Sequence, residues 1–130
     1  MIKKCKFLVL ISLLTTIVSK AQEVKSYTYF ENDSISLKLD LFIPTIKTEQ
    51  KTPLLIYVHG GGFKNGDRAN GHDLAKYLAL HNIASASISY TLHMKDQSFS
   101  CDGTLAEKIK AIQIAASQLW HATDYLIEKS

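Results

Sequence analysis

Cysteine, proline and tryptophan are scarce in this sequence, with two Cys, two Pro and one Trp among 130 residues. So few cysteines exclude a small fold held by several disulfides, and they exclude the usual zinc-ligand spacings. The chain also has no internal repeat and no low-complexity tract, which excludes collagen-like and disordered classes. A hydrophobic share of 46% with 21% charged residues is ordinary for one globular domain of this length.

The one stretch that resembles a membrane segment lies at the N-terminus. Lysines at positions 3, 4 and 6 precede an apolar run, Phe7 to Val18, and Ser19-Lys20-Ala21 then offers small residues for cleavage. This pattern predicts a signal peptide over residues 1–21 and export to the periplasm or the outside. An uncleaved anchor is the alternative, although the run is short for a permanent span. Cys5 precedes the run, so we expect no lipoprotein anchor.

An excess of charge is lacking once this segment is set aside. Beyond Ala21, eleven basic residues remain against twelve acidic residues, a net charge of −1. No basic stripe remains to suggest nucleic acid or an anionic membrane surface as a partner. Cys101 is then the only cysteine, and its polar surroundings favour an absent disulfide partner over a buried thiol.

Residue patterning predicts an α/β fold over residues 22–130. Alternation over 25–30 and 34–42 indicates two strands joined by a short turn at 31–33, an antiparallel hairpin. The continuous apolar run Leu54–Val58 indicates a strand covered on both faces, as in a parallel sheet. A loop over 60–70, a helix over about 72–81 and a strand over 83–90 then predict a right-handed parallel crossover.

A last helix begins at Thr104, where Thr104 and Glu107 have the spacing of a capping box, and it ends near Ile127. Asn82 stands where the preceding helix needs a left-handed residue to end. In the second strand, Ser36, Lys38 and Asp40 should face solvent. We expect the following apolar stripes to be buried: Ile35, Leu37, Leu39 and Leu41 in the second strand; Leu74, Tyr77, Leu78 and His81 in the first helix; and Leu105, Ile109, Ile112, Ala116, Leu119 and Leu126 in the last helix.

The segment with the strongest functional signal is His59-Gly60-Gly61-Gly62-Phe63, directly after the buried strand. Three glycines let the backbone turn tightly and aim several N–H groups at one point, as a developing oxyanion requires. A phosphate loop does not fit, because Asp67 follows Gly66 where lysine is needed. The dinucleotide pattern fails as well, because Asn65 stands where its third glycine should be. A glycine turn without function is the remaining alternative.

Taken with neighbouring motifs, this segment resembles the N-terminal half of α/β-hydrolases, closest to HGGG-type bacterial carboxylesterases and lipases, including polysaccharide deacylases. The supporting motifs are Leu39-Asp40-Leu41-Phe42-Ile43-Pro44, Gly66-Asp67-Arg68 and the strand from Ala84 to Leu92. The resemblance implies the first part of the family's sheet, with residues 22–130 forming a partial domain. It implies no cofactor and no metal, and a small ester or acylated carbohydrate as substrate of the complete protein.

The resemblance also assigns roles to residues. Backbone N–H groups of Gly60, Gly61 and Gly62 would form the oxyanion hole. His59 would brace the loop, and Phe63 would line the acyl or alcohol pocket. In this family an arginine often follows the tyrosine at the end of the next strand, but Thr91 follows Tyr90 here. We expect Asp67 and Arg68 to form a structural pair that holds the loop.

A serine nucleophile is missing from this half of the family pattern. The 130 residues contain no G-x-S-x-G, and the family places that motif after the last helix seen here. We therefore expect a truncated, exported ester hydrolase whose Ser-His-Asp triad lies downstream and which is inactive alone. Without the neighbouring strand that the family supplies, Leu54–Val58 becomes an exposed edge, so we expect poor solubility. The alternatives are a non-catalytic complementing half-domain and, less well supported by Phe63, Tyr90 and Phe99, a polysaccharide-binding accessory protein.

The remaining polar residues give weaker signals. His72-Asp73 could form an acid–base pair, but adjacent residues at a helix start more often cap the helix. Asp102 and Glu107 have the same capping interpretation. His81, His93 and His121 share no metal-ligand spacing.

Overall fold

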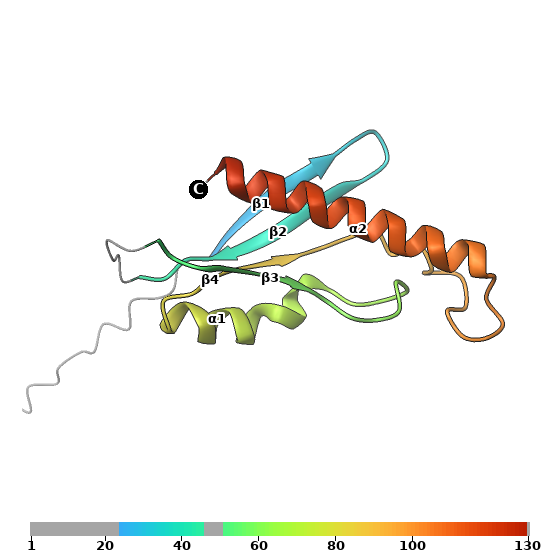
Figure 1. The fold of residues 1–130 in the computed structure, drawn as a ribbon, viewed down its shortest axis with the longest axis horizontal. Coiled ribbons are helices and arrows are strands. Elements are labelled where there is room, and N and C mark those ends of the chain that lie inside the picture. The colour runs from blue at the N-terminus through green and yellow to red at the C-terminus, as the bar shows by residue number, and fades with distance from the viewer. Residues whose placement is uncertain (1–23, 46–50, 130) are drawn as a thin grey trace, which may run out of the picture.

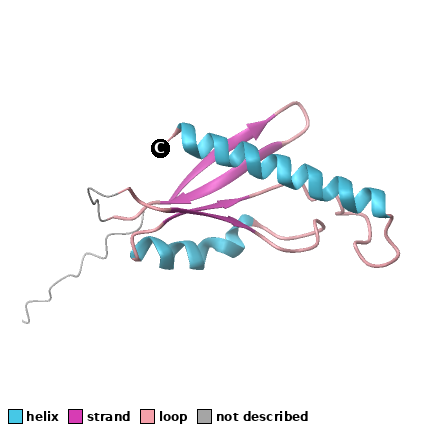
Figure 2. Cartoon of the chain, viewed as in Figure 1, coloured by secondary structure: helices cyan, strands magenta, loops and turns pink. Residues whose placement is uncertain are grey.

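The computed structural model describes residues 24–45 and 51–129. Along these residues it contains strands β1 (Val24–Glu31), β2 (Ser36–Phe42) and β3 (Leu54–Val58), a short 3₁₀ turn η1 (Arg68–Gly71), helix α1 (His72–Leu80), strand β4 (Ala84–Ile88) and helix α2 (Leu105–Glu128). The strands form one sheet, with α1 against one face and α2 against the other (Figure 1, Figure 2). The predicted signal peptide, residues 1–21, lies outside the described residues.

The strand order is β1-β2-β4-β3. β1 and β2 form an antiparallel hairpin, and β2 also pairs antiparallel with β4, with Leu39 opposite Ile88. β3 and β4 are parallel, with Val58 opposite Ile88. The predicted hairpin and the predicted parallel crossover are therefore confirmed, and the sheet is the mixed sheet expected for the first part of an α/β-hydrolase.

The sheet is buried on both faces at β2, which differs from the prediction. Leu37 and Leu39 are buried toward α2, as expected. Asp40 was expected to face solvent, but it is buried on the opposite face, and so is Phe42. The reason is that η1 and α1 cover this face, with α1 contributing to a small core around Phe42.

Helix α1 packs through small residues, so its predicted apolar face is wrong. Ala75 and Ala79 are buried against Phe42, whereas Leu74 and Tyr77 are exposed and Leu78 is only half-buried. Alanines let the helix approach the sheet closely, and side chains at neighbouring positions then turn outward. The end of the helix is as predicted, because Asn82 has a φ of 62°.

Helix α2 crosses the sheet, but most of its predicted apolar stripe is exposed in the described part of the chain. The side chains that it buries are Ala111, Gln118, Ala122 and Leu126, and the last two of these pack with sheet residues in the main core. Of the predicted stripe, Leu126 is buried and Leu119 half-buried, but Leu105, Ile109, Ile112 and Ala116 are exposed. This exposed stripe lies about a third of a turn around the helix from the buried side chains, at 3.6 residues per turn. The helix therefore has two apolar flanks, of which the sheet covers one.

The predicted capping box at the start of α2 does not form. Thr104 is at the cap position with an extended backbone, but its side chain accepts no capping hydrogen bond. The Glu107 carboxylate instead lies 2.7 Å from Nε2 of His93. Glu107 therefore connects α2 to the loop that precedes it.

Strand β3 lies at one edge of the sheet and is the least covered strand of the crossover. Leu54, Leu55 and Val58 are exposed, which contradicts the prediction of a strand covered on both faces. β3 has only β4 as a neighbour among the described residues, and the expectation of an exposed edge therefore describes it better. Among those residues, no helix combines the length and the apolar character needed to cross a bilayer.

Candidate functional site

The glycine loop lies at the edge of the sheet where β3 and β4 end. β1 runs in the same direction as these two strands, because β1 and β4 are both antiparallel to β2. The β1–β2 turn and the loops that follow β3 and β4 consequently lie at the same end of the molecule (Figure 1). This arrangement brings His59 next to Tyr90, although 31 positions separate them in the sequence.

His59 anchors the start of the glycine loop. Its side chain is buried, and its ring stacks on the Tyr90 ring with centroids 4.4 Å apart. The Tyr90 hydroxyl donates a hydrogen bond of 2.9 Å to the His59 carbonyl oxygen, and burial raises the pKa of this hydroxyl. Nδ1 of His59 lies 2.9 Å from the Gly60 carbonyl oxygen. Because a carbonyl only accepts, Nδ1 must carry the proton in this contact.

The conformation of the loop depends on glycine at two positions. Gly61 has a φ of 127° and Gly66 a φ of 116°. A Cβ on Gly61 would lie 2.0 Å from the Asn65 carbonyl oxygen, and a Cβ on Gly66 would lie 2.3 Å from Nδ1 of His59. Packing within this chain therefore explains these two glycines, with no ligand needed.

Gly60 has no such explanation within the described chain. Its φ is not positive, and a Cβ built on it meets no atom within 4 Å. Gly60, Gly61 and Gly62 are all exposed, and among the described residues the N–H groups of Gly61 and Gly62 donate no hydrogen bond. β3 ends before them, so ladder pairing does not use these amides. They are free to donate to an anion that approaches from outside.

Aromatic rings line the loop beside these amides. Phe63 adopts the left-handed conformation, with a φ of 58°, and its ring lies 6.0 Å from the Tyr90 ring and 5.4 Å from the Phe99 ring. A non-glycine residue in this conformation needs support from its surroundings. The Phe63 carbonyl oxygen accepts a 2.9 Å hydrogen bond from the N–H of Met94, which is completely buried. The loop between β4 and α2 thus holds the glycine loop from the other side.

Thr91 stands at the position where the family resemblance led us to look for an arginine. Its N–H donates to Oε1 of Gln118 at 2.8 Å, and its hydroxyl oxygen accepts from Nε2 of Gln118 at 2.7 Å. Gln118 is buried on α2. This pair of hydrogen bonds ties the end of β4 to the middle of the helix. The sequence pattern missed it, because a glutamine on a helix more often faces water.

Asp40 is the centre of a polar network on the α1 side of the sheet. It accepts hydrogen bonds from Nε of Arg68 at 2.7 Å, from Nε2 of His72 at 2.8 Å and from the Ser26 hydroxyl. Burial by itself raises the pKa of Asp40, but the hydrogen bonds from Ser26 and His72 and the charge of Arg68 outweigh it, so the pKa is lowered. Arg68 also donates to the Ser89 hydroxyl at 3.2 Å.

This network corrects the expected Asp67–Arg68 pair, and it gives His72 a partner that neither the capping nor the acid–base interpretation of His72-Asp73 predicted. Arg68 pairs with Asp40 and not with Asp67, whose carboxylate instead accepts from the N–H of Ala69 and caps η1. Asp67 and Arg68 therefore stabilise the segment after the glycine loop through separate contacts. His72 likewise turns toward Asp40, while the exposed Asp73 lies 3.5 Å from Lys76, so the two adjacent residues form no acid–base pair.

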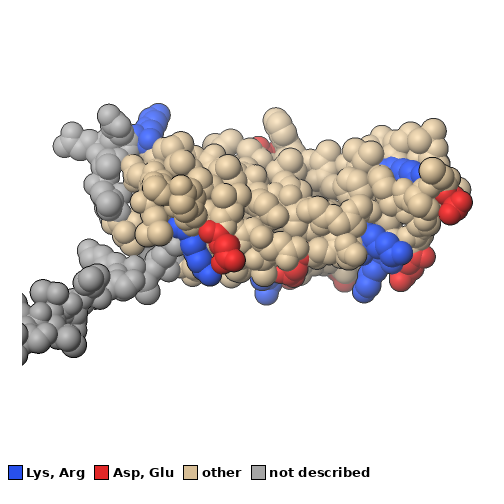
Figure 3. Space-filling model, turned by 90° about the horizontal axis from the view of Figure 1, so that it is seen from below, with Lys and Arg blue, Asp and Glu red and all other residues tan. Residues whose placement is uncertain are grey.

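The other histidines are dispersed over the fold. His81 packs on Tyr77, His93 on Glu107 and His121 on Phe30. In the described part of the chain, no group of three or more His, Cys, Asp or Glu side chains is placed to hold a metal ion. Cys101 is an exposed free thiol. On the face that carries α1, Figure 3 shows basic and acidic side chains scattered over a broad uncharged surface.

Solved structures of an esterase from Thermogutta terrifontis are similar to this chain. Esterase 2 phosphoramylated by tabun is 20% identical with a TM-score of 0.48, and the match covers 52% of this chain and 26% of the esterase. The butyrate-bound form of this thermophilic esterase, Est2, is 22% identical with a TM-score of 0.49, covering 58% and 27%. The propionate-bound form is 25% identical with a TM-score of 0.46, covering 54% and 25%. The match thus spans about a quarter of the length of these structures.

No curated protein matches the chain by sequence. The BD-FAE family, an esterase-like family of α/β-hydrolases, matches residues 39–115. This range is more than half of the chain, and it includes the second half of β2, the whole crossover and the glycine loop. The chain therefore belongs to the BD-FAE family.

Proposed function

We propose that this chain is the N-terminal part of an exported ester hydrolase, and that its glycine loop supplies the oxyanion hole for a Ser-His-Asp triad located elsewhere in the complete domain. The observation that carries the proposal is the pair of exposed, unbonded N–H groups of Gly61 and Gly62 at the end of β3. Membership in an esterase-like family supports it. Export is inferred from the signal-peptide pattern in residues 1–21.

The chemistry requires donors that are in place before the reaction. When a serine oxygen adds to an ester carbonyl, negative charge develops on the carbonyl oxygen, and the Gly61 and Gly62 amides would donate to it. Gly60 leaves the space beside them open. Stacking of His59 on Tyr90 fixes the base of the loop, so that the amides need not reorganise as charge develops. Phe63 and Phe99 provide an apolar wall for the acyl or alcohol part.

The nucleophile must come from another part of the complete domain. The chain has no G-x-S-x-G motif, and it spans about a quarter of the esterase structures that it resembles. We therefore expect the 130-residue product to hydrolyse short p-nitrophenyl esters no faster than buffer. The substrate of the complete protein would be a small ester or an acyl group on a carbohydrate.

The sharpest test uses Gly60→Ala with Gly61→Ala as the matched control. In a chimera, residues 24–129 replace the matching part of the Thermogutta terrifontis esterase, which supplies the triad. Gly60→Ala places a methyl group in the open space beside the Gly61 and Gly62 amides. The methyl group meets no atom of the chain, so the chimera should unfold at the same temperature. It would obstruct the approach of the ester oxygen to these amides, so kcat/KM should fall on the order of 100-fold. Gly61→Ala should lower both stability and activity. Full activity in a stable Gly60→Ala chimera would contradict the oxyanion role.

Direct binding gives an answer that does not depend on the chimera. In the full chain, labelled with ¹⁵N, the amide signals of Gly61 and Gly62 should shift when butyrate is added, because a carboxylate can accept from free N–H groups. Amides inside the β2–β4 ladder serve as the control and should not move. Unchanged Gly61 and Gly62 signals at saturating butyrate would count against an anion cradle.

A second candidate is a non-catalytic half-domain that is completed by another polypeptide. It is favoured by the exposed β3 edge together with the bare stripe of α2. His121, on the other flank of α2, packs against β1, so the stripe points away from β1 and toward the β3 side of the sheet. A polypeptide that added a strand to β3 could therefore cover the stripe as well. Light scattering decides this: a defined heteromer with the remainder of the family domain supports it, and a stable, soluble monomer opposes it.

A further inference from the structure

A pocket lies at the end of the sheet opposite to the glycine loop. β2 ends there, β3 and β4 begin there, and the C-terminal end of α2 borders the pocket from one face of the sheet (Figure 1). The pocket has a volume of about 230 Å³. We name it the end pocket, and its apolar lining consists of Leu41, Ile43, Leu54, Ala84 and Leu126.

The polar groups of the end pocket carry charge of one sign. Of the described residues that line it, only Thr52 and Lys129 are polar, and none is acidic. Both are exposed, whereas Leu126 is 5% exposed, so the amino group lies at the mouth and Leu126 at the floor. Nζ of Lys129 lies 5.8 Å from the centre of the Tyr125 ring, and it forms no ion pair in the described part of the chain. The mouth of the pocket is therefore positive.

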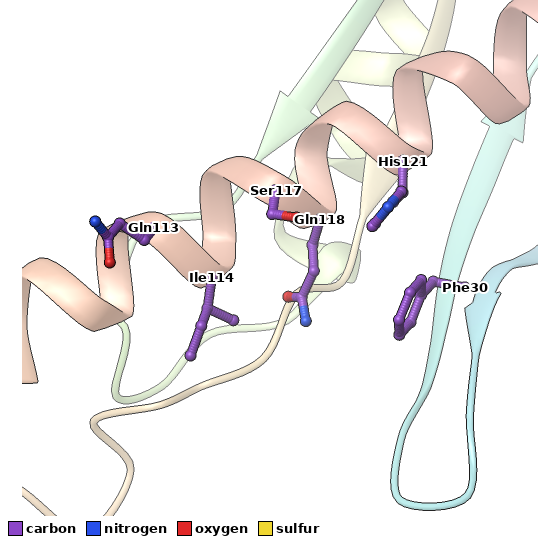
Figure 4. A pocket seen from close by; sticks show the side chains of 6 residues that line it. All are labelled: Phe30, Gln113, Ile114, Ser117, Gln118 and His121. Atoms are coloured by element: carbon purple, nitrogen blue, oxygen red, sulfur yellow. The ribbon is translucent and has the colours of Figure 1, made fainter.

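A second hollow, between β1 and α2, differs from the end pocket in its lining. Figure 4 shows Phe30 facing α2 from β1, with polar side chains projecting from the helix. Gln113 and Ser117 line this hollow, and none of its described lining residues is a lysine or an arginine. An alkyl tail would remove water from the amide and the hydroxyl without replacing their hydrogen bonds, and an anion would find no cation. This hollow therefore supplies an internal negative control for an apolar ligand with an anionic head.

We propose that the end pocket binds a free medium-chain fatty acid, with its alkyl tail against Leu54 and Leu126 and its carboxylate at the mouth. Burial of the tail removes apolar surface of both the ligand and the pocket from water. Since an apolar cavity of about 150 Å³ holds one benzene molecule, the volume of the end pocket suits a tail of about eight carbons. The Lys129 ammonium and the Thr52 hydroxyl can both donate hydrogen bonds to the carboxylate.

Other classes of ligand fit the end pocket less well. A cationic amphiphile would be repelled by Lys129, and a neutral hydrocarbon would leave the ammonium without a partner. A phospholipid carries two long tails, which exceed the volume of the pocket. One short tail with one negative charge is the combination that matches the lining.

The end pocket is separate from the glycine loop. Leu54 begins β3 and lines the pocket, whereas the glycine loop follows Val58 at the other end of this strand. The rise of the strand between these two residues is about 13 Å. A fatty acid whose carboxylate lies at Lys129 therefore does not reach the Gly61 and Gly62 amides. Its binding does not depend on the proposed ester hydrolysis.

The test is a titration of the full 130-residue ¹⁵N-labelled chain with octanoate and with butyrate, in detergent-free buffer and below the micelle concentration of octanoate. We expect octanoate to shift the amides of Leu54, Ala84 and Leu126 and to leave those of Ile114 and Ser117, in the second hollow, unchanged. Each methylene group that leaves water contributes about fourfold in affinity. Octanoate has a longer tail than butyrate but leaves part of it exposed, so it should bind at least about tenfold more tightly.

Two variants separate the charge at the mouth from the apolar contact. Lys129→Gln should weaken octanoate binding about fivefold and leave the binding of 1-octanol, which has a tail of the same length without the charge, unchanged. Leu54→Ala should weaken both ligands about threefold. Lys95→Gln and Leu80→Ala are the matched controls and should change neither affinity, because both residues are exposed and neither lines the pocket. The amide spectrum without ligand reports the fold of each variant.

The proposal is overturned if octanoate leaves the end-pocket amides unmoved, if butyrate binds there as tightly, or if the amides of the second hollow shift equally. It is also overturned if Lys129→Gln fails to distinguish octanoate from 1-octanol. A loss of octanoate binding in Lys129→Gln, with 1-octanol binding retained, supports it. Shifts of Gly61 and Gly62 with either acid report on the oxyanion proposal, and their absence would leave the end pocket unaffected.

Discussion

The two strands of the crossover, β3 and β4, have equal length and run side by side, but they differ sharply in burial. Every residue from Ser85 to Ile88 in β4 is buried, although two of the four are serines. β3 is entirely apolar apart from the Tyr57 hydroxyl, and yet its residues Leu54, Leu55 and Val58 are exposed. Burial here is therefore set by neighbours and not by hydrophobicity. The composition of β3 suits a strand with partners on both sides.

The largest expected effect comes from truncating the two residues that face each other in this pair. Ile88→Ala removes a completely buried side chain and should lower the free energy of unfolding by about 3 kcal/mol. Val58→Ala, at the paired position, should cost less than about 1 kcal/mol, because Val58 is 41% exposed. Urea unfolding measures both. Equal losses would mean that self-association covers β3 in solution.

The buried carboxylate of Asp40 should contribute more to stability than the exposed carboxylate of Asp73. Asp40→Ala leaves Arg68 and His72 without their shared acceptor and should cost about 2 kcal/mol, less than for a fully buried pair because both partners retain some contact with water. Asp73→Ala removes only a surface contact to Lys76 and should change the stability too little to detect. Thermal unfolding of the two variants distinguishes them, and a similar melting temperature for both would refute the network.

The glycine loop allows a smaller contrast. Gly61→Ala should lower the free energy of unfolding by about 1 to 2 kcal/mol, because the new methyl group meets the Asn65 carbonyl and the φ is positive. Gly60→Ala should remain within about 0.5 kcal/mol of the parent, since neither constraint applies there. Chemical unfolding of the chain resolves this difference. A large loss for Gly60→Ala would mean that its space is already occupied.

The smallest effect is a dependence of stability on pH. The folded-state pKa of Asp40 is lowered, so the unfolded chain binds a proton at a higher pH than the folded chain does. The stability that Asp40 contributes is thus complete above its ordinary pKa of about 4 and declines as the pH falls toward the folded value. Asp40→Asn should remove this part of the decline between about pH 5 and 3. An identical acid profile for Asp40→Asn and the parent would show that Asp40 contributes nothing.

Local patterns predicted which elements form but not which side of each is covered. The β1–β2 hairpin, the crossover and the left-handed Asn82 follow from alternation, run length and turn chemistry. The faces of α1 and α2 did not follow, because small alanines sit against the sheet while larger leucines and isoleucines lie elsewhere. A search for hydrophobic residues at a period of 3.6 finds the stripe of large side chains, because alanine counts as only weakly hydrophobic.

The candidate site likewise contains residues that the sequence indicated and residues that it did not. The loop from His59 to Phe63 was identifiable because its glycines follow an apolar strand, and Tyr90 because it ends the strand predicted over 83–90. Asp40 had a weaker signal that was missed: the residue two positions later on the same face is Phe42, which breaks a simple apolar–polar alternation. Gln118 and Met94 gave no local signal, because their partners, Thr91 and Phe63, are brought to them only by the tertiary fold.

The length of α2 links these parts mechanically. A helix of 24 residues is a stiff rod about 36 Å long. Near its middle, Gln118 is hydrogen-bonded to Thr91, the residue that follows Tyr90. Any partner that tilts the rod by pressing on its bare stripe would displace Thr91, and through Tyr90 the base of the glycine loop. Contact on one flank of the helix would then change the direction of the glycine-loop amides.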